Sequence, residues 1–70
     1  MEFRIEMKLE VEDGTDELAT RVPITVQVIY RGGRWQAQCI QPPFCTVLCD
    51  NMQEALVYAA KEAARELAAA

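Results

Sequence analysis

Residues 24–39, ITVQVIYRGGRWQAQC, decide the fold of this chain. β-Branched and aromatic residues flank Gly32 and Gly33, which predicts two antiparallel strands joined by a two-residue turn, because both central positions of such a turn favour positive φ. With the turn fixed there, Tyr30 lies opposite Trp35, and side-chain alternation assigns the other residues to two faces. One face is apolar and consists of Ile24, Val26, Val28, Tyr30, Trp35, Ala37 and Cys39. The opposite face shows Thr25, Gln27, Gln36 and Gln38, with Ile29 as its apolar exception.

The chain before the hairpin adds one more strand. Residues 2–12, EFRIEMKLEVE, alternate charged and apolar side chains, which predicts a half-buried strand. Turn-forming residues follow at 13–16, and the polar stretch that leads to Pro23 is expected to be a loop with room for one helical turn at 16–20.

The chain after the hairpin predicts a short strand and a helix. Pro42 and Pro43 cannot donate ladder hydrogen bonds, so they end the third strand, and the apolar run at 44–49 predicts a fourth. Asn51 followed by Glu54 fits a capping box, in which each side chain accepts from the other residue's backbone N–H. The helical stripe beyond it consists of Met52, Leu56, Ala59, Ala60, Ala63 and Leu67. We expect this stripe to cover the sheet, with a partner interface as the alternative.

These elements predict an α+β fold, an antiparallel four-stranded sheet in the order β-β-β-β-α packed against one C-terminal helix. The 70 residues form a single domain, 1–70, because a second domain would be too short to enclose its own core. A chain of this size buries roughly 60% of the surface that its unfolded form exposes, so we expect a homodimer or higher homo-oligomer to add stability. The predicted strands are 2–12, 24–31, 34–41 and 44–49, and the predicted helix is 51–68.

The net charge of −4 favours a basic protein as partner. Acidic residues concentrate in the first quarter of the chain: Glu2, Glu6, Glu10, Glu12, Asp13, Asp16 and Glu17. The negative potential of this region repels phosphate, so direct nucleic-acid binding is not expected. The candidate partner-binding residues are Glu2, Glu6, Glu10 and Glu12. No stretch resembles a signal peptide or reaches the roughly 20 apolar residues of a membrane-spanning helix, so we expect a cytoplasmic protein with no membrane contact.

The cysteines are expected to be reduced, buried thiols. Cys39, Cys45 and Cys49 cannot all pair within one chain, which indicates an intracellular protein. A zinc site, the alternative, needs about four ligands, and the chain has no histidine and no Cys-x-x-Cys pair. A nucleophilic thiol would need a basic neighbour, and Arg34 is the nearest one in the sequence.

Other catalytic and cofactor sites are not expected either. The carboxylates belong to a charged strand face or to a loop, which favours a solvated surface that maintains solubility over acid–base catalysis. Gly32-Gly33 precedes a strand and not a helix, so it is no phosphate-binding loop. Tyr30 and Trp35 could stack nucleic-acid bases, but few basic residues accompany them, which favours packing. We therefore expect no enzymatic activity, no cofactor and no metal.

Residues 24–67 resemble the HicB family of antitoxins. The shared features are a hydrophobic strand, a glycine hairpin, a Trp-x-Ala strand, a proline before a cysteine, and a capped amphipathic helix. The family often shows Pro-Gly-Cys and, a few residues later, Gly-Asp-Thr-x-x-Glu-Ala. The residues that match are Pro43, Cys45, Asp50, Glu54 and Ala55. The residues that depart, at the two glycines and the threonine, are Phe44, Cys49 and Asn51.

The resemblance implies a fold like a partial double-stranded-RNA-binding domain that has lost its RNA-binding surface. Members of the family are commonly dimeric and inhibit a small basic ribonuclease toxin called HicA. The resemblance therefore implies a module that binds such a toxin. The alternative is a stand-alone homo-oligomer with a structural or small-ligand role, whose unpaired strand edges meet in a dimer.

Overall fold

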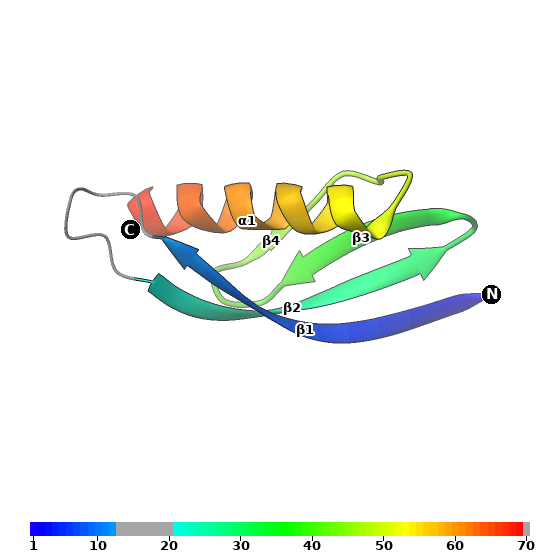
Figure 1. The fold of residues 1–70 in the computed structure, drawn as a ribbon, viewed down its shortest axis with the longest axis horizontal. Helices are drawn as coiled ribbons and strands as arrows, with labels where there is room; N and C mark the ends of the chain where they lie inside the picture. Colours follow the sequence, from blue (N-terminus) through cyan, green and yellow to red (C-terminus); the bar gives the residue numbers. More distant parts are fainter. Residues whose placement is uncertain (13–20, 70) are drawn as a thin grey trace.

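The computed structural model describes residues 1–12 and 21–69 as one sheet and one helix (Figure 1). The elements are β1 (Glu2–Glu12), β2 (Arg21–Arg31), β3 (Arg34–Cys39), β4 (Phe44–Cys45) and α1 (Met52–Ala69). The sheet is antiparallel, and its strand order follows the chain, β1-β2-β3-β4. This confirms the predicted α+β architecture. The turn predicted at 13–16 and the helical turn at 16–20 lie outside the described residues.

The Gly32-Gly33 turn has the predicted geometry. Gly32 has φ 59° and Gly33 has φ 83°, values that residues with a Cβ adopt with difficulty. Arg31 therefore pairs with Arg34, and Tyr30 lies opposite Trp35. The register predicted from the turn is confirmed.

β2 begins at Arg21, earlier than the predicted start at residue 24, and it contains Pro23. In a two-residue hairpin the backbone groups of Arg31 face β3, and by alternation those of Pro23 face the same side. The pairing of β2 with β3 stops at Val26 and Cys39, so the missing N–H of Pro23 breaks no ladder bond.

The third and fourth strands are shorter than predicted. β3 stops at Cys39 instead of 41, and β4 covers Phe44–Cys45 instead of 44–49. Cys49 does return to β3, where it exchanges backbone hydrogen bonds of 2.8 and 2.7 Å with Trp35. The chain, however, takes three steps from Thr46 to Cys49, while β3 takes two from Ala37 to Trp35. The extra residue forms a bulge, which interrupts the strand.

The core lies between the sheet and α1, which runs along one face (Figure 1). Val26 and Val28 are fully buried on the sheet side. The helix meets them with small side chains, because the fully buried positions of α1 are Ala55, Ala59 and Ala63. Ala55 lies outside the stripe that the sequence predicted. The larger residues of that stripe are half-buried around this contact, namely Met52, Leu56 and Leu67.

The cap of α1 is partly as predicted. Asn51 Oδ1 accepts a 2.8 Å hydrogen bond from the backbone N–H of Glu54. The carboxylate of Glu54 accepts from the side-chain amide of Asn51 at 3.0 Å, not from its backbone N–H as expected. The helix start is stabilised by this single residue pair.

We predict that Ala59→Leu destabilises the fold by about 1–3 kcal/mol, because the added atoms have no space between α1 and the sheet. The exposed Ala68→Leu variant on the same helix should change stability by less than about 0.5 kcal/mol. Urea unfolding followed by circular dichroism measures both. Equal effects of the two substitutions would contradict the close approach of helix and sheet.

Candidate protein-binding surfaces

The sheet face opposite α1 is charged but balanced. Its carboxylates, all from β1, are Glu2, Glu6, Glu10 and Glu12. Register places five of the chain's seven basic residues on the same face: Arg4, Lys8, Arg21, Arg31 and Arg34. The structure thus brings the four predicted partner-binding residues onto one face of one strand, and it surrounds them with cations.

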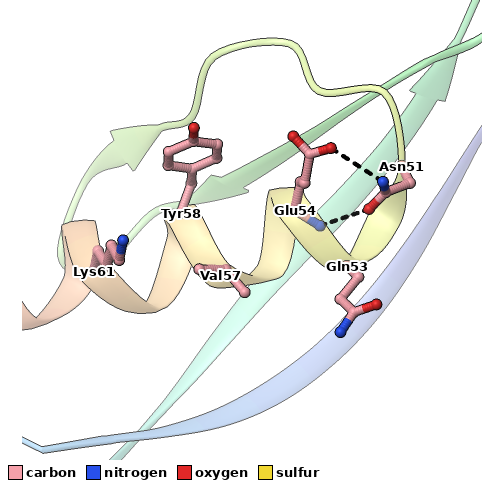
Figure 2. Close-up of a pocket in the computed structure, with 6 residues that line it drawn as sticks. All are labelled: Asn51, Gln53, Glu54, Val57, Tyr58 and Lys61. Atoms are coloured by element: carbon pink, nitrogen blue, oxygen red, sulfur yellow. Dashed lines mark hydrogen bonds between the residues drawn. The ribbon is translucent and has the colours of Figure 1, made fainter.

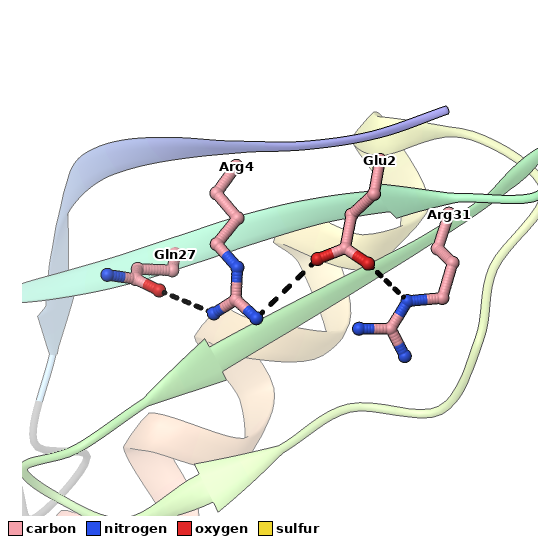
Figure 3. Close-up of polar contacts among 4 residues, drawn as sticks. All are labelled: Glu2, Arg4, Gln27 and Arg31. Carbon is pink, nitrogen blue, oxygen red and sulfur yellow. Dashed lines mark hydrogen bonds and ion pairs between the residues drawn. The ribbon is translucent and has the colours of Figure 1, made fainter.

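Glu2 is engaged by two of these cations (Figure 3). Arg31 Nε donates to Glu2 Oε1 at 2.8 Å, and Arg4 Nη2 lies 3.6 Å from Glu2 Oε2. Arg4 also donates to Gln27 Oε1 at 3.3 Å. The hydrogen bond from Arg31 and its positive charge lower the pKa of Glu2, and the same contact raises the pKa of Arg31. Sequence reasoning missed this pairing, because neither the hairpin register nor the alternation of β1 fixes how β1 is aligned with β2.

The far end of β1 is less neutralised, and we call Glu10, Glu12 and Arg21 the acidic end. Arg21 Nη1 lies 3.6 Å from Glu10 Oε2, and Arg21 is the cross-strand partner of Glu12. Within the described part of the chain, Glu12 makes no ion pair, and neither does Glu6. The sequence adds Asp13, Asp16 and Glu17 directly after Glu12.

An apolar hollow lies at the same end of the sheet but on its helix side, where β2 extends past the end of β3. Its volume is about 400 Å³, and its lining residues are Val22, Pro23, Ile24, Gln41, Pro42 and Leu67. Val22 and Leu67 are half-buried, so part of their apolar surface is open to solvent.

Ile29, the apolar exception on the charged face, is buried, with 5% of its surface exposed. Its cross-strand neighbours are Arg4 and Gln36. The methylene groups of such long polar side chains cover apolar surface. Ile29 therefore presents no binding surface.

The bulge after β4 exposes a second apolar area, because both Val47 and Leu48 point out of the core, 67% and 56% exposed. Thr46 holds the bulge in place. Its hydroxyl accepts the backbone N–H of Ala37 at 2.9 Å and lies 3.0 Å from Val47 O, to which it donates. The hydroxyl thus replaces a ladder carbonyl. The side-chain amide of Gln36 donates to the carbonyl of Thr46 at 2.9 Å.

The outer side of α1 carries a neighbouring hollow of about 330 Å³ (Figure 2). Its lining residues are Asn51, Gln53, Glu54, Val57, Tyr58 and Lys61. Tyr58 also lines a hollow next to Val47, so the helix and the bulge share one surface. This surface has exposed apolar side chains and charges of both signs.

Two of the cysteines are buried as expected, while Cys45 is exposed, which corrects the prediction for it. The thiol of Cys39 lies 3.4 Å from Thr25 O, and that of Cys49 lies 3.4 Å from Val47 O. Burial raises the pKa of Cys49, and the nearby carboxylates of Glu54 and Asp50 raise it further. The buried Cys49 is accordingly held in its neutral thiol form.

Other site chemistry is limited within residues 1–12 and 21–69. There, no three Cys, Asp or Glu side chains gather closely enough to hold a metal ion. In the same part of the chain, no helix has the length and apolar character needed to cross a membrane.

Comparison with protein-family models, with curated proteins and with solved structures gives no match for this chain. The resemblance to HicB antitoxins stays a prediction from the sequence.

We predict that Thr46→Val destabilises the fold by about 1–3 kcal/mol, because it leaves the buried N–H of Ala37 without an acceptor. Thr25→Val makes the same chemical change on the exposed sheet face and should stay within about 0.5 kcal/mol of the native chain. Urea unfolding measures both. A Thr46→Val variant as stable as Thr25→Val would show that the hydroxyl does not hold the bulge.

We predict that one thiol, that of Cys45, reacts rapidly with Ellman's reagent in the folded protein, and that Cys39 and Cys49 react only after unfolding in urea. Burial withholds the latter two from the reagent. The absorbance of the released thiolate counts the reactive groups. Cys45→Ser should remove the rapid phase, and rapid reaction of all three thiols in the native state would contradict the structure.

Proposed function

We propose that this chain is a non-enzymatic protein-binding module which, like HicB-type antitoxins, binds and neutralises a small basic ribonuclease toxin. The observation that carries the proposal is the net negative charge at the acidic end of the sheet, where Arg21 alone faces Glu10 and Glu12 among the described residues.

The charge distribution along β1 supports this location. At the start of the strand, Glu2 is matched by Arg31 and Arg4, so this region attracts neither sign strongly. At its other end, Arg21 is the one basic residue within 10–21, and it faces the carboxylates of Glu10 and Glu12. Three further acidic residues follow in the sequence. Of the four candidate partner-binding residues, we therefore assign Glu10 and Glu12 to the contact with the partner.

The chemistry of the partner follows from this field. A concentration of carboxylates steers a basic protein toward it and speeds association, and salt screens this effect.

We predict that full-length tagged protein recovers one small basic protein from its host at near-stoichiometric level at about 50 mM salt, and much less at about 500 mM, where screening is strong. Mass spectrometry identifies the partner. The partner should cleave RNA when purified alone and lose this activity when the native chain is added.

A matched pair of variants tests the surface. Glu10→Gln with Glu12→Gln should slow association with that partner roughly tenfold at low salt. Glu62→Gln with Glu66→Gln makes the same change in net charge on α1 and should slow it much less. Stopped-flow fluorescence of Trp35 or surface plasmon resonance gives the rates. Equal effects of the two pairs, or an association rate insensitive to salt, would contradict the proposed surface.

The second candidate function, a stand-alone homo-oligomer, is favoured by a different observation: the outer edge of β1 pairs with no strand of residues 1–12 and 21–69. It predicts that the pull-down returns only the chain itself, as a dimer or larger assembly. An RNase-inhibiting complex would exclude it as the whole function.

A further inference from the structure

β1 is an eleven-residue edge strand, and no other strand of residues 1–12 and 21–69 pairs with its outer side. An edge of this length presents a row of unpaired backbone N–H and C=O groups. Its first half extends beyond the start of α1 (Figure 1). There Phe3 and Ile5, which point to the helix side, remain 39% and 38% exposed. The edge thus has both ladder groups and apolar surface without a partner.

The aromatic cluster beside this edge keeps it in a defined shape. The ring of Phe3 stacks on Tyr30 with centroids 5.1 Å apart, and it meets Trp35 edge-on at 5.7 Å. The cross-strand pairing of Phe3 with Tyr30 supports the same arrangement. Because these contacts hold the strand, pairing with another strand requires little further ordering.

The hairpin turn determines which backbone groups of β1 face outward. Arg31 bonds across the turn to Arg34, so the backbone groups of Tyr30 face β1. Alternation then directs the backbone of Phe3 toward β2 and that of its even-numbered neighbours outward. The outward ladder positions in the first half of β1 are Glu2, Arg4, Glu6 and Lys8.

The signs of these four charges alternate and are antisymmetric about Ile5. If a second copy pairs antiparallel with Ile5 opposite its own Ile5, then Glu2 lies opposite Lys8 of the second copy and Arg4 lies opposite Glu6. Each charged pair then has opposite signs and also exchanges two ladder hydrogen bonds. On the other face, apolar residues meet apolar residues, with Phe3 opposite Met7.

Neighbouring registers that keep the apolar faces together bring like charges into contact. Centring the pair on Arg4 or on Glu6 places that residue opposite itself. Centring it on Met7 places Glu2 opposite Glu12. Like charges directly opposite each other destabilise a sheet, so the Ile5-centred register is selected by charge.

We propose that two copies of this chain associate through β1, antiparallel and centred on Ile5, to form one continuous eight-stranded sheet. The two-fold axis runs through the sheet between the two Ile5 residues, so both helices lie on the same face. The register leaves Glu10 and Glu12 outside the paired segment. The dimer therefore does not depend on the partner proposed above, and either proposal can fail alone.

Disulfide trapping tests the register. In a background of Cys45→Ser, which removes the exposed thiol, Ile5→Cys should form a covalent dimer under mild oxidation. The reason is that a non-hydrogen-bonded antiparallel pair has Cα atoms about 4.5 Å apart, within disulfide reach. Met7→Cys on the same face is the matched control, since its two copies lie roughly 13 Å apart in this register. Non-reducing electrophoresis reads out both.

A charge exchange tests the pairing in the absence of cysteine chemistry. Arg4→Glu alone and Glu6→Arg alone should each raise the dimer dissociation constant roughly tenfold, because each places like charges opposite each other. The double variant restores opposite charges, and it should return to within about threefold of the native constant. Sedimentation equilibrium measures the constants, and circular dichroism verifies that each variant is folded.

Three results would overturn the proposal. One is a native chain that remains monomeric at about 100 μM. Another is cross-linking through position 7 and not through position 5, which would place the centre at Met7. The last is a double variant weaker than either single one, which is what the Met7-centred register predicts because Arg4 would then face Glu10 and Glu6 would face Lys8.

Discussion

The positive φ of Gly32 and Gly33 is the constraint on which the rest of the structure depends. A two-residue turn fixes which residues of β2 and β3 lie opposite each other. It also fixes which backbone groups face which neighbour, and this alternation continues into β1 through the β1–β2 pairing. The position of Pro23, the apolar surface under α1 and the outward amides of β1 all follow from that parity. A slip of one residue would reverse every one of them.

Sequence reasoning succeeded where structure is governed by period and by turn chemistry. The hairpin, β1 and α1 follow from local pattern, and so do two of the three buried helix alanines, Ala59 and Ala63. It failed between Thr46 and Cys49, where the six-residue apolar run has the composition of a strand. A hydroxyl that substitutes for a backbone carbonyl decides the outcome there, and no periodicity reports such a contact. It also missed the shielding of Ile29, which depends on cross-strand neighbours.

On the charged face, too, the sequence predicts the local pattern but not the contacts between strands. The sequence places four carboxylates on one side of β1, and the structure agrees. The sequence does not show how many cations the fold brings to this face from β2 and β3. Arg31 and Arg21 are distant along the chain from their ion-pair partners Glu2 and Glu10. Net charge is a property of the chain, whereas the field at a surface depends on which charges the fold places side by side. At the acidic end, the described part of the chain places one cation, Arg21, beside the carboxylates of Glu10 and Glu12.

The bulge after β4 has a consequence for how large an assembly of this protein can grow. A sheet with two regular edges adds copies without limit and becomes a fibril. Here one edge, β1, is regular, while the other has two paired residues followed by a bend that Thr46 locks. Regular strand addition is therefore expected at β1 alone, and in the proposed dimer a single pairing event occupies the β1 edge of both copies. In the proposed assembly, the short and irregular β4 offers no second regular edge, so growth stops at two copies.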